Sequence, residues 1–142
     1  MPMIHRLALL AALAIATPAA ADPWPICVRG QPDTACVVDG DTVHYRGRKI
    51  RLIATDAPET EHASCPQERA AGERTRDRLA ELLAAGVRVE TEGREDRYGR
   101  LLARLVTPAG DVETILLDEG LTLPYRRSAE ERERRREHWC GR

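Results

Sequence analysis

Residues 36–59 read CVVDGDTVHYRGRKIRLIATDAPE, and this stretch decides the fold. It contains short segments rich in β-branched residues, separated by the turn-forming pairs Asp39-Gly40 and Arg46-Gly47. Pairs of this kind join neighbouring antiparallel strands in hairpins. We therefore predict successive strands at residues 36–38, 42–45 and 49–54. Apolar side chains alternate along the last of these, so one face of the small sheet is expected to line the interior of a barrel.

A long helix is expected after this sheet. Ser64 and Gln67 form a capping box with Pro66 in the first turn, and Gly86 is a good C-terminal cap residue. Gly72 weakens this helix slightly.

The second half of the chain adds two strands and two helices. The predicted elements are strands at residues 87–91 and 100–107, a helix at 112–119, and a charged helix opened by a capping box of Ser128 and Glu131 and ending near Cys140. This order excludes a parallel doubly wound sheet, in which strands and helices alternate throughout. Five strands with a helix between the third and the fourth predict an α+β fold, mainly β: a five-stranded Greek-key OB barrel with three helices.

The first residues have the pattern of a signal peptide. Arg6 precedes an apolar run at residues 7–17 that is too short to span a bilayer as a stable helix. Small residues then lead to Asp22, and we predict cleavage between Ala21 and Asp22. An uncleaved anchor would need a longer apolar stretch. The mature protein is therefore expected in the periplasm or outside the cell, as a monomer with no stable membrane association.

Size and charge limit the remaining possibilities. The chain carries 22 Lys and Arg against 23 Asp and Glu, and losing Arg6 with the leader leaves 21 against 23. A strongly basic nucleic-acid scaffold is thus not indicated, unless the positive charge gathers in one cleft. The predicted organisation is a signal peptide at 1–21, an irregular Pro- and Gly-rich lead-in at 22–35 and one folded domain at 36–142.

All of the cysteines lie after the leader. An even number in an oxidising compartment indicates two disulfides, although four cysteines allow three connectivities. We favour Cys27 with Cys36 and Cys65 with Cys140. A metal site built from these cysteines is disfavoured, because the chain has no Cys-x-x-Cys and its histidines are not at ligand spacing.

Three clusters carry the residue types that phosphodiester hydrolysis needs: residues 39–42, 51–59 and 96–100. Asp41 and Asp56 come from neighbouring strand ends and can converge on a hard, oxygen-seeking cation, for which calcium fits better than zinc. Glu59 follows three residues later and is the candidate general base. Arg51 and Arg100 offer planar forks that bind phosphate oxygens in pairs.

Together these clusters resemble the signature of the staphylococcal nuclease family, from about Val37 to Gly120. The resemblance implies a calcium-dependent nuclease with Asp41 and Asp56 as calcium ligands. It also implies a third ligand in the backbone carbonyl of Ala57, where the family usually has threonine, and a supporting carboxylate in Asp39. Because a carbonyl does not depend on the side chain, coordination is expected to survive the alanine.

The resemblance assigns the remaining roles as well. Glu59 is implied as the base or water-orienting group, and Arg51 and Arg100 as the groups that stabilise pentacoordinate phosphorus. Tyr98 and Tyr125 are implied to line the nucleotide pocket. The implied reaction is hydrolysis of DNA and RNA with little sequence preference, leaving 3′-phosphate ends.

Each cluster also has a structural interpretation. Asp39-Gly40 alone is more simply a hairpin turn, Arg51 could form a structural ion pair with Asp56 or Glu59, and Arg100 could be solvated. On this basis the alternative function is a catalytically inactive module of the same fold that binds single-stranded nucleic acid or protein. A disulfide-stapled envelope protein would leave the acids unexplained. Residues 126–137 are predicted as a solvated helix that pairs with itself, Glu131 facing Arg135.

Overall fold

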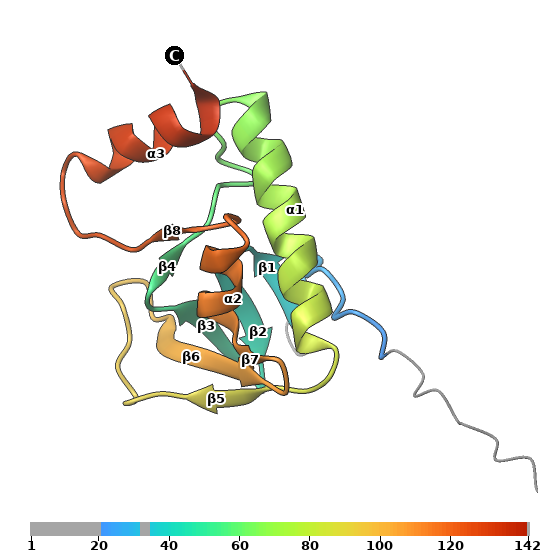
Figure 1. The fold of residues 1–142 in the computed structure, drawn as a ribbon. Helices are drawn as coiled ribbons and strands as arrows, with labels where there is room; N and C mark the ends of the chain where they lie inside the picture. Colours follow the sequence, from blue (N-terminus) through green and yellow to red (C-terminus); the bar gives the residue numbers. More distant parts are fainter. Residues whose placement is uncertain (1–20, 32–34, 142) are drawn as a thin grey trace, which may run out of the picture.

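The computed structural model describes residues 21–31 and 35–141, so the predicted leader lies outside the described residues except for Ala21. The fold is α+β and mainly β, as predicted, with three helices (Figure 1). The helices are α1 (Pro66–Leu83), α2 (Val112–Asp118) and α3 (Glu131–Cys140). The strands are β1 (Cys36–Asp39), β2 (Thr42–Tyr45), β3 (Arg48–Leu52), β4 (Thr55–Asp56), β5 (Arg88–Glu90), β6 (Leu101–Thr107), β7 (Gly110–Asp111) and β8 (Leu123–Pro124).

The main sheet has the strand order β1-β2-β3-β6-β5, with β7 paired to β6. Neighbours in this order are antiparallel except β3 and β6, which run parallel. If these five strands are numbered in chain order, as in an OB fold, the first, second, third, fifth and fourth lie side by side in that order. Among the residues that the structure describes, no pairing joins β1 to β5, so the sheet follows the predicted connectivity without a hydrogen-bonded closure.

The predicted strand at 49–54 is wrong at its last two residues, 53 and 54. β3 ends at Leu52, and the chain bends before β4 pairs with β8 in a separate two-stranded sheet. At this bend, side chains form the hydrogen bonds that a neighbouring strand would otherwise form with the backbone. Arg51 donates to the carbonyls of Leu52 and Thr55, and the Glu113 carboxylate of α2 accepts from the Ala54 N–H. The bend therefore depends on a local side chain, Arg51, and on a distant one, Glu113, and it turns Asp56 toward the β1–β2 turn.

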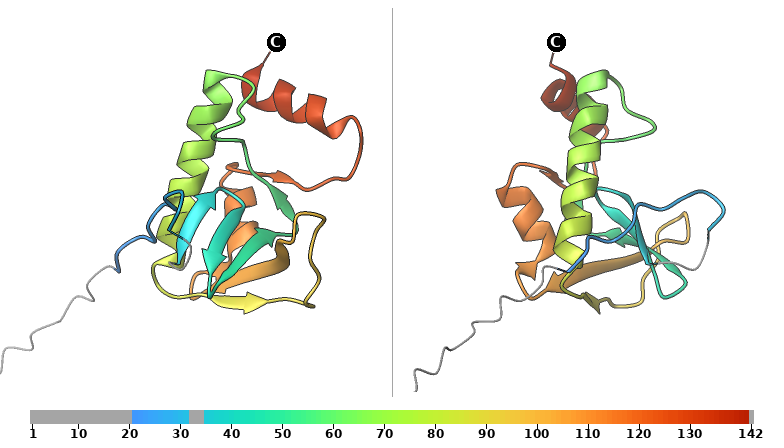
Figure 2. Two further views of the ribbon diagram at one scale, coloured as in Figure 1. Left: turned by 180° about the vertical axis from the view of Figure 1, so that it is seen from behind. Right: turned by 90° about the vertical axis from the view of Figure 1, so that its right-hand side faces the viewer.

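One core joins the sheet to the helices. Its fully buried side chains include Val37, Val43, Ile50, Leu52, Leu79, Leu83, Leu105 and Leu116. Figure 2 shows α1 running beside the sheet, and α3 lying next to the end of α1 that points away from the sheet. The lead-in joins this core too. The backbone N–H of Trp24 donates to the backbone carbonyl of Ala80, and the centroid of the Trp24 ring lies 5.3 Å from that of the Tyr45 ring.

Both predicted capping boxes differ in the structure. The N-cap of α1 is Cys65, whose sulfur accepts from the Glu68 N–H, and the Glu68 carboxylate accepts from the Ser64 N–H. Pro66 shifts the helix start by one residue, which makes Glu68 rather than Gln67 the reciprocal partner. The N-cap of α3 is Glu130, and it makes no side-chain capping bond.

The two favoured disulfides are present. Cys27 bonds Cys36, and Cys65 bonds Cys140, which fastens the last turn of α3 to the start of α1. In the described part of the chain, no helix is both long enough and apolar enough for a membrane span.

Candidate active site

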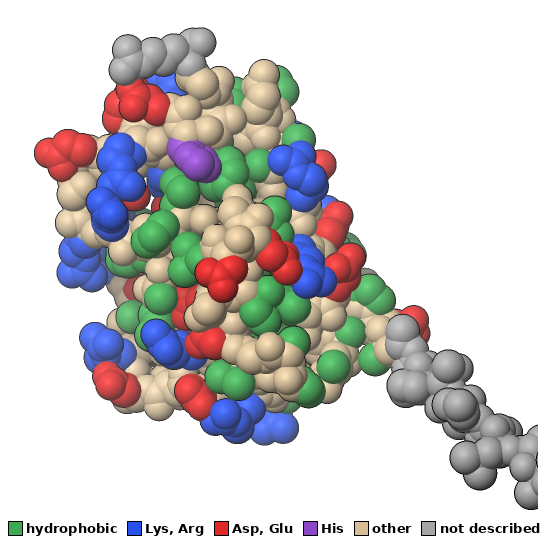
Figure 3. Space-filling view, in the orientation of Figure 1, with side chains coloured by type: hydrophobic (Ala, Val, Ile, Leu, Met, Phe, Trp, Pro, Cys, Tyr) green, Lys and Arg blue, Asp and Glu red, His purple; other side chains and the backbone are tan. Residues whose placement is uncertain are grey.

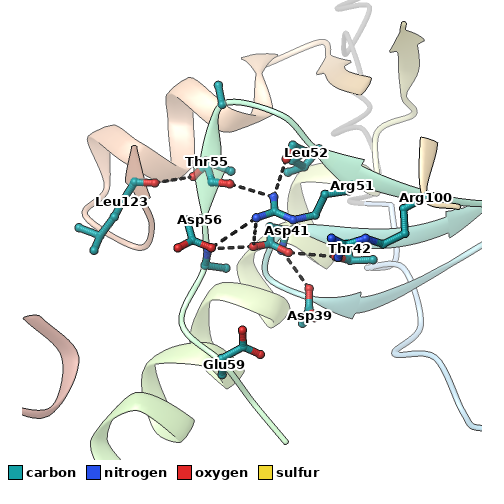
Figure 4. Close-up of polar contacts among 12 residues, drawn as sticks. Asp39, Asp41, Thr42, Arg51, Leu52, Thr55, Asp56, Glu59, Arg100 and Leu123 are labelled. Carbon is teal, nitrogen blue, oxygen red and sulfur yellow. Dashed lines mark hydrogen bonds and ion pairs between the residues drawn. The ribbon is translucent and has the colours of Figure 1, made fainter. Parts of the chain in front are cut away.

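Two aspartates, Asp41 of the β1–β2 turn and Asp56 of β4, meet at one guanidinium. Arg51 Nη2 lies 3.0 Å from Asp41 Oδ2 and 3.3 Å from Asp56 Oδ1 (Figure 4). All three residues are buried, at 7–8 % exposure. Sequence reasoning expected both carboxylates to converge and also allowed a structural pair between Arg51 and Asp56. In the structure the two carboxylates converge, and Arg51 forms an ion pair with each of them.

The β1–β2 turn aims Asp41 at this point. The Asp41 N–H donates to Asp39 Oδ1, and Asp41 Oδ2 accepts from the Ala57 N–H at 2.9 Å, which ties the turn to the segment after β4. Gly40 makes this approach possible, because a Cβ there would stand 2.5 Å from Cγ2 of Thr75 and 2.8 Å from Cβ of Ala57. The Asp39-Gly40 pair is thus both a hairpin turn and part of the site.

Glu59 is held through its backbone by α1. Its N–H donates to Glu68 Oε1 at 3.3 Å. Gly72 lets the helix pass close, since a Cβ there would lie only 2.6 Å from the Glu59 carbonyl oxygen. The carboxylate of Glu59 stays 42 % exposed. The glycine predicted only to weaken α1 therefore positions the loop that carries the candidate base.

Arg100 lies beside the cluster (Figure 4), and a tyrosine stacks on each of the two candidate phosphate-binding arginines, Arg51 and Arg100. Arg51 pairs in register with Leu102 across the parallel strands, so Arg100, two residues earlier, lies on the same face of the sheet as Arg51. Asp96 holds Arg100 by an ion pair of 2.6 Å, and Tyr98 stacks 5.4 Å from its guanidinium. Tyr125 stacks 5.8 Å from the Arg51 guanidinium. Tyr98 is 67 % and Tyr125 48 % exposed, which leaves both rings accessible.

Arg135 of α3 also reaches the site, which sequence reasoning missed. Its Nε lies 2.8 Å from Asp56 Oδ2, and its Nη2 donates to the Ala57 carbonyl at 3.0 Å and to Glu59 Oε1 at 3.5 Å. The predicted pairing of Glu131 with Arg135 is wrong, because Glu131 is buried and pairs with Arg134. Only the Cys65–Cys140 disulfide hinted that α3 comes near.

Negative charge exceeds positive charge here. The carboxylates of Asp39, Asp41, Asp56, Glu59 and Glu68 are met by the guanidinium groups of Arg51 and Arg135. Burial, with the neighbouring Asp41 carboxylate, raises the pKa of Asp39 to about 7. Burial also raises the pKa of Asp56 to about 6 although Arg135 opposes it. The cluster therefore lacks positive charge at neutral pH.

The cluster offers hard oxygen donors to a cation. Among the described residues, no group of three or more His, Cys, Asp and Glu side chains is arranged to hold a metal ion. A cation here would thus rely on Asp41, Asp56 and a backbone oxygen such as that of Ala57. The Ala57 carbonyl accepts one hydrogen bond from Arg135 and keeps a second lone pair. This donor set and the charge deficit fit calcium.

Comparison with known proteins finds one family model and several named relatives. Residues 49–139 match the family model described as staphylococcal nuclease homologue. "Endonuclease YhcR" of Bacillus subtilis (strain 168) is 35% identical over 103 residues, covering 63% of this chain and 8% of that protein. "Micrococcal nuclease" of Shigella flexneri is 35% identical over 103 residues, covering 63% of this chain and 55% of that protein.

One relative has a name of another kind. "Succinoglycan biosynthesis protein ExoI" of Rhizobium meliloti (strain 1021) is 38% identical over 93 residues, covering 61% of this chain and 48% of that protein. The match thus spans at most 55% of the length of any of these three relatives. Since the family model covers well over half of the present chain, the chain belongs to the staphylococcal nuclease family.

Proposed function

We propose that this protein is a calcium-dependent nuclease that hydrolyses phosphodiester bonds of DNA and RNA with little sequence preference. The observation that carries the proposal is the convergence of Asp41 and Asp56 on one point beside the Arg51 guanidinium. Membership of the family and the relatives named as endonucleases support a nuclease. Weak sequence preference follows from a site that offers contacts to phosphate and to a stacked base, with no base-edge reader among them.

In this proposal Asp41, Asp56 and the Ala57 carbonyl would hold calcium, and Asp39 would support them. When bound, calcium supplies positive charge that neutralises a phosphate oxygen. Those ligand oxygens are hard donors, and the raised pKa values of Asp39 and Asp56 reflect the charge deficit that such an ion relieves.

The protein's own groups do the rest of the work. Glu59, exposed and tied by its backbone, accepts a proton from the attacking water or orients it. Arg51 and Arg100 donate hydrogen bonds to the phosphate oxygens as charge develops on them. Tyr98 and Tyr125 offer exposed rings to a nucleotide base. The family resemblance adds that the bond to the 5′ oxygen breaks and a 3′-phosphate end remains.

Digestion assays test the proposal directly. Purified protein with calcium is expected to degrade single-stranded DNA, double-stranded DNA and RNA, and EGTA is expected to stop all three reactions. Product ends are read by susceptibility to a 3′-phosphatase. Binding of nucleic acid without hydrolysis at any calcium concentration would instead support the inactive binding module.

The pH dependence of stability tests the charge deficit. Because the folded-state pKa of Asp39 is about 7 and that of Asp56 about 6, both above the ordinary value of 3.8, the folded protein holds these protons more tightly than the unfolded chain. Their stabilising contribution is complete below about pH 4 and is lost as the pH rises through 6 and 7. We expect Tm in EGTA to fall over this window, and calcium to raise Tm most at pH 7.5 and above.

Asp39→Asn is the matched control for this measurement, since it removes the carboxyl with the larger pKa shift and keeps its shape. Its Tm in EGTA should depend less on pH than that of the wild type. An equally steep pH profile in both proteins contradicts the proposed origin of the effect.

We further propose that the chain works in the periplasm or outside the cell. Its disulfides suit an oxidising compartment. The proposed state is a monomer that contacts nucleic acid as its substrate.

A further inference from the structure

A groove lined by arginines runs beside the candidate active site. It has a volume of about 550 Å³ and lies between α3, the segment that leads from β8 to α3, and the site. Its basic side chains are Arg97, Arg126, Arg127, Arg132 and Arg135. Figure 3 shows Lys and Arg side chains gathered at the left, over α3 and the segment before it. In a protein with balanced overall charge, this is the kind of local concentration that sequence reasoning required of a nucleic-acid partner.

The positive charge of the groove is largely uncompensated. In the described part of the chain, Arg126, Arg127 and Arg132 make no ion pair, and all three are exposed. Most other arginines of the described residues do pair with a carboxylate, as Arg78 does with Glu119 and Arg48 with Glu95. The groove does contain acids, but Asp56 is already paired with Arg51 and Arg135, and Glu131 with Arg134.

The groove is continuous with the candidate active site. Asp56, Tyr125 and Arg135 line the groove and also belong to the site or contact it. Arg132 and Arg135 are three residues apart on α3, so they share a face and are offset by about 4.5 Å along the axis. A chain of anions leaving the site past Arg135 therefore meets Arg132 next, with the segment carrying Arg126 and Arg127 on the opposite wall.

We propose that this groove binds the phosphates of the polynucleotide beyond the one that is cleaved. The ligand is a flexible single strand, whose evenly spaced negative charges match a row of guanidinium forks, and the exposed ring of Tyr125 offers a stacking surface where the strand enters. The inference rests on the proposed nuclease function. It adds that the chain prefers long substrates over dinucleotides because α3 holds the strand.

The test compares two triple substitutions. The groove variant is Arg126→Gln, Arg127→Gln, Arg132→Gln. The control is Arg46→Gln, Arg69→Gln, Arg74→Gln, which removes the same charge from exposed arginines that line no part of the groove and have no ion pair among the described residues. Circular dichroism checks that both are folded.

Binding is measured by fluorescence anisotropy with a labelled single-stranded oligonucleotide of about twelve nucleotides, in a Glu59→Gln background to prevent cleavage. We expect the groove variant to bind at least about tenfold more weakly at low salt. The slope of log K against log salt should become shallower by about 2, since each lost phosphate contact on a single strand accounts for about 0.7. The control should bind like the parent, and a groove variant with lysines in place of glutamines should recover most of the slope.

Cleavage gives a second readout. The groove variant should show a larger increase in KM on the long strand than on a dinucleotide. Equal binding and equal salt slopes in the groove and control variants overturn the inference. Wild-type protein that binds through the groove but cleaves nothing refutes the proposed function and leaves only the binding of a single strand by the groove, so the two failures are distinguishable.

Discussion

Glu59→Gln is expected to lower kcat by about 10²–10⁴-fold while the protein stays folded, because a positioned general base contributes on that order. The amide keeps the size of the side chain and cannot accept a proton from water. Stability should change little, since the backbone N–H of Glu59 still donates to Glu68 and an amide oxygen can still accept from Arg135, as Glu59 Oε1 does at 3.5 Å. Measurement of kcat at saturating calcium and DNA, with thermal unfolding of the same sample, separates the two effects.

Glu61→Gln is the matched control. Glu61 lies two residues further along the same loop, its carboxylate is 72 % exposed, and its ion pair is with the exposed Arg29. Its substitution should leave kcat within about twofold of the wild-type value, as is usual for exposed positions away from the chemistry. A folded Glu59→Gln protein with wild-type kcat removes Glu59 from the mechanism.

Strands and helices that depend on neighbouring residues could be predicted from local sequence patterns. The strand predicted at residues 42–45 is where β2 lies, because its β-branched residues and the turns on either side of it are encoded within a few residues. The pairing of β4 with β8 was not foreseen. It joins Thr55 to Pro124 and depends on Glu113 holding the Ala54 N–H, contacts that no local periodicity can reveal.

The candidate site shows the same division. Asp41, Asp56 and Arg51 lie in short motifs, so the sequence identified them, and the structure brings them together. Arg135 lies in a helix where the i, i+4 rule favoured Glu131 as its partner. Two tertiary features override that rule. Glu131 is buried and forms its ion pair with Arg134. Arg135 forms ion pairs with two carboxylates, those of Asp56 and Glu59, which together attract its guanidinium more strongly than one surface carboxylate could.

The Cys65–Cys140 disulfide holds α3, and with it Arg135, against the site. It closes a sequence separation of 75 residues, whereas Cys27–Cys36 closes only 9. In the chain-entropy account, a crosslink stabilises by restricting the unfolded chain, and the gain rises with loop length. The two bonds should therefore differ in their contributions to stability, and only the longer one should matter for the geometry at Asp56.

Replacing Cys65 and Cys140 by serine is expected to lower the free energy of unfolding by about 4–5 kcal/mol, against about 2.5 kcal/mol for Cys27→Ala with Cys36→Ala. Serine at position 65 preserves the helix cap that the Cys65 sulfur provides, and alanine suits position 36, which is buried. Urea unfolding measures both variants. Because α3 is released only in the first variant, its kcat/KM on DNA should also fall, even at temperatures where it remains folded. A smaller stability loss for the Cys65 and Cys140 pair than for the Cys27 and Cys36 pair would show that α3 is held mainly by packing and by the ion pairs of Arg135.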